Sequence, residues 1–172
     1  MIVPADFRGH DWSAHDPAPF EAHLNTAIMA IASIIFPTGF EASEDAPDTY
    51  EKLKARLDAG HRMIVWSGGS DATVFGAPVV NWAFRAWHDW CHWHGEYPFT
   101  LDGEKAACAM QCDQLVALYG DTPRIRRWQQ ILDADIVGQW HYQAETGRFP
   151  ADQRLFVLSA LRQRDRATAL VV

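Results

Sequence analysis

Basic residues are scarce in this chain. Fifteen Lys and Arg stand against 22 Asp and Glu, which gives a formal net charge of -7 and a pI near 5.5. The sequence has no basic cluster that could release counterions from a phosphate backbone. We therefore expect no binding to a nucleic-acid duplex.

Long apolar runs and a cysteine framework are missing as well. The longest apolar run, residues 27–36, is too short to cross a bilayer, which takes about 20 residues. Residues 1–20 have neither the basic start nor the apolar stretch of a signal peptide. Three cysteines are an odd number, which favours a reducing compartment over a disulfide framework. These absences predict a cytoplasmic protein with no membrane span and no export.

The composition and the hydrophobic periodicity predict one mostly α domain over residues 1–172. The chain is 48% hydrophobic and 22% charged, as in globular proteins. Apolar residues spaced by three and four predict a bundle of about six helices, over residues 20–36, 49–59, 79–94, 103–119, 123–146 and from 150 onward.

Three segments outside these helices carry expectations of their own. Residues 1–19 should form an irregular arm that packs through Phe7 and Trp12. Residues 41–48, which are acidic, should form a loop. Within 62–75, two short apolar stretches flank a glycine-rich turn, which predicts a small β-hairpin.

Two histidines lie four residues apart in the predicted helix 79–94. His88 and His92 stand one turn apart on one face, so both imidazoles can reach the same ion. They continue a polar stripe with Asn81 and Arg85 along a helix rich in tryptophan. A stripe that merely faces water would look the same, so the pair alone is weak evidence for a metal.

Two carboxylates strengthen the metal prediction. Asp89 can reach the ion or hold one imidazole in place, and a short connection can bring Glu104 back beside the histidines. The predicted metal ligands are therefore His88, Asp89, His92 and Glu104. Two histidines and a carboxylate suit zinc and iron(II) alike.

The same residues form a known kind of motif. His88-Asp89-Trp90-Cys91-His92, followed by eleven residues and Glu104, resembles the H-D-x-x-H-x11-E metal motif of the fourth coenzyme Q biosynthesis protein family. Pro98 and Gly103 also stand where this family often has Pro and Gly. The resemblance spans residues 88–104. It implies a metal at His88, Asp89, His92 and Glu104 on an all-helical scaffold, and an activity like that of ubiquinone biosynthesis, in which a prenylated aromatic ring loses its C1 carboxyl and is hydroxylated there.

Two residues further along the chain are candidates to complete the site. Asp135 and Gln139 share the apolar face of the predicted helix 123–146, and buried polar groups need partners. We predict catalytic roles for Asp135, Asp89 and Glu104. The alternative for Asp135 is an ion pair with Arg124, Arg126 or Arg127.

Two other pairs show ligand-like spacing. His141 and Glu145 are four apart and would extend the site to a second metal, although they lie on another helix face. Cys108 and Cys112 have the same spacing among alanines, which is more typical of small buried side chains.

Three functions remain open from the sequence. The leading one is a metal-dependent enzyme that acts on a small organic, aromatic or prenylated substrate. The second is an HD-type phosphohydrolase of nucleotides that uses His61, His88, Asp89 and Asp135. The third is a non-enzymatic protein, stabilised by metal, whose tryptophan-rich surface binds a partner chain or a second copy in a homo-oligomer.

Overall fold

Helices form most of the computed structural model, which describes residues 1–3 and 10–169. The α-helices are α1 (Ala22–Ile35), α2 (Tyr50–Asp58), α3 (Pro78–His94), α4 (Leu101–Tyr119), α5 (Pro123–Asp133), α6 (Gln139–Thr146) and α7 (Gln153–Ala169). A short 3-10 helix, η1 (Trp12–Ala14), precedes them, and a π-helix, η2 (Ala134–Gly138), joins α5 to α6. The mostly α prediction is confirmed.

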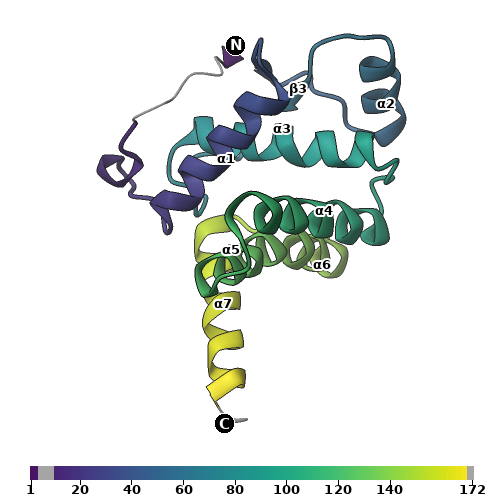
Figure 1. Cartoon of the computed structure of the whole chain (residues 1–172). Helices are drawn as coiled ribbons and strands as arrows, with labels where there is room; N and C mark the ends of the chain where they lie inside the picture. The colour runs from purple at the N-terminus through teal and green to yellow at the C-terminus, as the bar shows by residue number, and fades with distance from the viewer. Residues whose placement is uncertain (4–9, 170–172) are drawn as a thin grey trace.

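Helix α3 lies at the centre of this arrangement, between α1 and α4 (Figure 1). Its buried face carries Val80, Phe84 and Trp87, which are 0%, 4% and 0% exposed. The apolar core continues from α1 through α3 to the first half of α7, where Val157 is also fully buried. The C-terminal end of α7 extends beyond the other helices (Figure 1).

A small sheet replaces the predicted β-hairpin, and that prediction is wrong in its pairing. Strand β3 (Ile64–Trp66) pairs in parallel with β2 (Phe40–Ser43), and β1 (Ile2–Val3) pairs antiparallel with β2. A parallel pair needs a crossover, and the chain between β2 and β3, including α2, provides it. The strands β1 and β2 fall where the sequence predicts an irregular arm and a loop.

Residues 72–75 form no strand because their backbone groups have other partners. The carbonyl of Phe75 accepts a hydrogen bond from Asn25 Nδ2 at 2.8 Å, and that of Val74 accepts one from Phe20 N at 2.8 Å. The Phe75 ring packs 4.8 Å from that of Phe84 on α3. The second apolar stretch therefore fixes α1 against α3.

Other expectations have mixed outcomes. Trp12 is buried as predicted, at 3% exposure, whereas Phe7 lies outside the described residues. The predicted helix 123–146 is interrupted by η2.

Within the described part of the chain, no helix combines the length and apolarity needed to cross a bilayer.

Candidate metal centre

The turn between α3 and α4 brings Glu104 back to the two histidines. Helix α4 begins at Leu101, two residues before the predicted start at 103, because Thr100 caps it: Thr100 Oγ1 accepts a hydrogen bond from Gly103 N at 3.2 Å. A Cβ on Gly103 would lie 1.8 Å from the Pro98 carbonyl oxygen, so only glycine permits this close approach. Glu104 consequently lies in the first turn of α4, facing α3.

Three ligand atoms converge at this point. His88 Nε2 lies 2.9 Å from Glu104 Oε2 and 3.0 Å from His92 Nε2, and His92 Nε2 lies 3.4 Å from the same carboxylate oxygen. These three residues are the metal-capable group in the described part of the chain. The structure thus assembles three of the four predicted ligands.

The outer nitrogen of each imidazole is already engaged. His92 Nδ1 lies 2.9 Å from the carbonyl oxygen of Tyr97, which can only accept, so Nδ1 carries the hydrogen. His88 Nδ1 lies 2.9 Å from Gln111 Oε1 in the same way. Both Nε2 atoms can then present lone pairs toward the Glu104 carboxylate. A proton on His88 Nε2 would make only one of these three close contacts favourable. A cation bound between the atoms would make all three favourable.

Burial and charge set the ionisation of the group. The His92 side chain is 0% exposed, and those of His88 and Glu104 are 14% and 17% exposed. Burial opposes ionisation of Glu104, but hydrogen bonds and positive charge from the two histidines outweigh it and lower the pKa of Glu104 to about 2. Burial also opposes a charge on His88, and Glu104 outweighs it, so the pKa of His88 is raised. The site therefore favours a carboxylate beside a positive charge.

Gln111 was not predicted as a site residue. It is fully buried on α4, two turns beyond Glu104. The seven-residue spacing places both side chains on one helix face, which is the signal that could have found it.

Asp89 lies next to the metal-capable group without belonging to it. It lines the same cavity as His88, His92 and Glu104. Desolvation outweighs the neighbouring positive charges and raises the pKa of Asp89 to about 6. Ligation by Asp89 stays a prediction, and its position at the cavity wall allows a role in proton transfer.

Asp135 and Gln139 line this cavity too, on the side formed by η2 and α6. Gln139 Nε2 donates to Asp135 Oδ1 at 2.7 Å. Desolvation, partly offset by the charge of Arg85, raises the pKa of Asp135 to about 6. The π-helix adds a residue to the turn here, a feature often found at functional sites.

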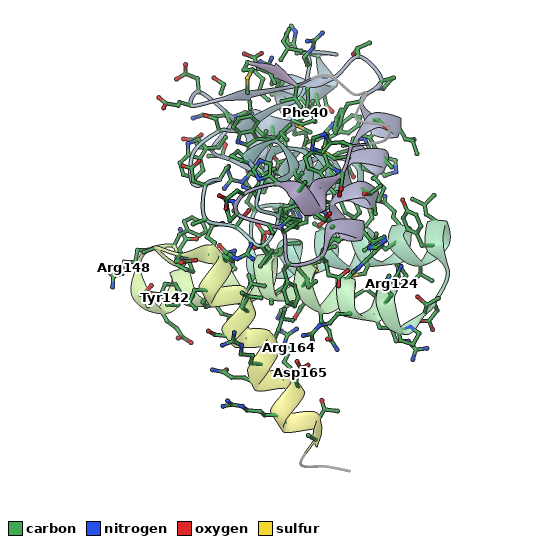
Figure 2. The ribbon with its side chains drawn as sticks, turned by 90° about the vertical axis from the view of Figure 1, so that its left-hand side faces the viewer. Phe40, Arg124, Tyr142, Arg148, Arg164 and Asp165 are labelled. Carbon is green, nitrogen blue, oxygen red and sulfur yellow. The ribbon has the colours of Figure 1, made fainter. Side chains whose placement is uncertain are left out.

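The alternative ion pairs of Asp135 are not formed in the structure. Arg127 binds Asp165 of α7 at 2.9 Å, and Arg126 binds Asp121 at 2.7 Å. Figure 2 shows Arg124 at the opposite end of the helical layer from Tyr142 of α6. All three arginines are therefore placed away from the cavity lining.

The cavity that adjoins the histidines has a volume of about 830 Å³. Aromatic side chains line much of it, from Trp66, Phe84, Phe99, Trp140 and Phe149. Arg85 enters it from α3 and fixes the loop after β3, since its guanidinium donates to the carbonyls of Trp66 at 2.7 Å and Gly68 at 2.6 Å. The polar stripe of α3, which consists of Asn81, Arg85, His88 and His92, thus faces this cavity.

The other candidate residues lie elsewhere. His61, His141 and Glu145 are exposed and do not line the cavity, so the structure brings none of them to the histidine pair. Cys108 is buried and Cys112 half-buried on α4, both as free thiols, in agreement with packing. Of the tryptophans, Trp66 is 50% exposed and the others are at least half-buried, so they form no exposed patch.

Comparison of the chain with models of known protein families, with curated proteins and with solved structures gives no match.

Proposed function

We propose that the chain is a metal-dependent enzyme that holds one divalent cation, zinc or iron(II), at His88, His92 and Glu104. The observation that carries the proposal is the convergence of three ligand atoms on one point, while the outer nitrogens of both imidazoles are engaged. Structural zinc sites are usually closed by four protein ligands, whereas catalytic sites have three and an open position. Three ligands beside a cavity favour catalysis on a small organic substrate.

The residues around the group supply the rest of the proposed chemistry. Bound zinc would activate water or a substrate oxygen as a Lewis acid, and bound iron(II) would supply oxidative chemistry. Asp89 and Asp135, each with a pKa of about 6, are suited to accept and return protons near neutral pH. The ring decarboxylation and hydroxylation implied by the family resemblance remains a prediction, since residues 88–104 are its only support.

The two other functions have less support from the geometry. The HD-type phosphohydrolase needs His61 at the metal, and His61 is exposed outside the cavity. An exposed tryptophan patch would favour the partner-binding function, and the eight tryptophans do not form one.

Metal content of the purified protein tests the proposal. We expect about one equivalent of zinc or iron in the wild type by mass spectrometry, and its loss in His92→Ala and in the isosteric Glu104→Gln. Far-UV circular dichroism should show that Glu104→Gln keeps its helices, which separates loss of metal from loss of fold.

His61→Ala is the matched control. It removes an exposed histidine that only the phosphohydrolase needs, and it should leave the metal content unchanged. A wild-type chain that binds neither zinc nor iron(II) on titration would overturn the proposal, and loss of metal in His61→Ala would favour the phosphohydrolase.

A further inference from the structure

Acidic side chains outnumber basic ones in the cavity beside the metal-capable group. The lining includes one arginine, Arg85, and five carboxylates, from Asp48, Asp71, Asp89, Glu104 and Asp135. Glu104 is bound by the histidines, Asp48 is paired with Lys52, and Asp71 is exposed at the rim. The carboxylates that remain inside the cavity are Asp89 and Asp135.

These two carboxylates have unused hydrogen-bonding capacity. Within the described residues, no hydrogen bond reaches the Asp89 carboxylate. Asp135 accepts one bond, from Gln139 to Oδ1, which leaves Oδ2 free among the described residues. Both carboxylates are half-buried, and desolvation raises the pKa of Asp135, so a donor brought to its free oxygen would stabilise the charged form. Both side chains therefore favour a ligand that donates hydrogen bonds.

Arg85 does not neutralise the pair. Its guanidinium interacts electrostatically with both carboxylates, yet its hydrogen bonds go to the carbonyls of Trp66 and Gly68 and it stacks 5.1 Å from the Trp66 ring centroid. Around these two aspartates, one positive charge from Arg85 therefore stands against two negative ones, apart from any cation that His88, His92 and Glu104 hold.

The walls around the carboxylates are aromatic. Phe84 lies on α3, Trp140 follows Gln139 on α6, and Phe99 and Phe149 contribute from loops. The faces of aromatic rings attract cations, most strongly where water is excluded. Acidic and aromatic side chains together are the surroundings that an organic cation requires.

We propose that the cavity binds a small organic cation with N–H donors, an amidinium, a guanidinium or a protonated amine, between Asp89 and Asp135. The two carboxylates bind the positive charge of this cation, and its apolar part packs against the aromatic walls. This inference rests on the proposed function, because it makes the cation the substrate class of that site. It points away from the ring carboxylate that the family resemblance implies.

Benzamidine and benzoate are matched probes, since they share size and shape and differ in charge. We expect the zinc-loaded wild type to bind benzamidine more tightly than benzoate by isothermal titration calorimetry. Asp135→Asn should weaken benzamidine binding at least about tenfold, as expected for a lost charge-assisted hydrogen bond, without weakening benzoate binding. Asp121→Asn, which changes an exposed aspartate outside the cavity, is the control.

Three outcomes would overturn the cation site. They are a preference for benzoate, equal benzamidine affinities in Asp135→Asn and the wild type, and a second equivalent of zinc that Asp135→Asn removes. Zinc content measured in the same samples tests the metal centre separately. Protein that binds benzamidine through Asp135 but no metal overturns the proposed function, whereas protein that holds zinc and prefers benzoate overturns the cation site alone.

Discussion

Gln111 holds His88 from the side opposite the candidate metal position. Its amide oxygen accepts from His88 Nδ1, and the amide nitrogen Nε2 is buried with no partner among the described residues. Gln111 therefore contributes little to the stability of the fold. It does fix the ring orientation of His88, a predicted metal ligand. Such a residue should matter more for metal binding than for folding.

Gln111→Leu tests this role. Removing a partner that orients a metal ligand typically weakens binding by about 10- to 100-fold, so zinc or iron(II) affinity should fall by that order with little change in the free energy of unfolding. Gln114→Leu is the control, because Gln114 on the same helix accepts from Trp87 Nε1 at 2.5 Å. It should cost stability and leave metal affinity unchanged; the reverse pattern would contradict the assignment.

Asp135 makes stability depend on pH. Its pKa is raised to about 6 from 3.8 by desolvation, so the folded state binds this proton more tightly than the unfolded state does. The folded state therefore favours the neutral form of Asp135. The stability that this proton contributes is fully present below about pH 4 and is lost as the pH rises to about 6. In metal-free protein, Asp135→Asn should remove this loss and be more stable above pH 6 by about 1–3 kcal/mol. Urea unfolding across this pH range measures it, and parallel profiles for the two proteins would count against it.

At the scale of elements, the α3–α4 connection determines where Glu104 stands. Helix α3 ends at His94, and after a short turn α4 begins under the Thr100 cap. Gly103 touches the Pro98 carbonyl because it has no side chain. The turn can then be tight enough to bring the first turn of α4 against the histidines.

Gly103→Ala should disturb this turn. The added methyl meets backbone, which cannot move aside as a side chain could, so we expect about 1–3 kcal/mol of destabilisation and weaker metal binding. Gly138→Ala provides the comparison, because its Cβ would meet Phe156 at an ordinary 3.5 Å. That change should be neutral or slightly stabilising. Equal effects of the two substitutions on unfolding and metal affinity would contradict this account of the turn.

At the scale of the molecule, the apolar core is formed independently of the metal-capable group. It extends from α1 to α7 and includes side chains on helices that carry none of the three candidate ligands, such as Leu24 and Leu161. A metal at this position would bind the folded chain and stabilise it by mass action, without being required for folding.

Chelation tests this independence. Removing the metal should lower Tm by several degrees, since a ligand at 100 times its Kd adds about 2.7 kcal/mol to the free energy of unfolding. The helical circular dichroism signal at room temperature should persist. His92→Ala, which lacks a ligand, should show no response to the chelator. Collapse of the helical signal on chelation would instead indicate a structural metal.

Local patterns in the sequence determined much of this protein. The spacing of apolar residues located the helices, and the four-residue spacing of His88 and His92 placed both imidazoles on one face. Only eleven residues separate His92 from Glu104, so Glu104 must lie near the histidines. These features depend on the period of a helix and on the length of one connection, which are properties of neighbouring residues.

Only the tertiary structure decided the rest. The partner of strand β3 lies more than 20 residues away across a helical crossover, so the glycine turn beside it was a misleading local signal. The positions of Arg85 and Asp135 in one cavity, and of Gln111 behind His88, depend on how α3, α4 and η2 pack. Packing of distant segments follows from the burial of many side chains at once, which no single spacing in the sequence records.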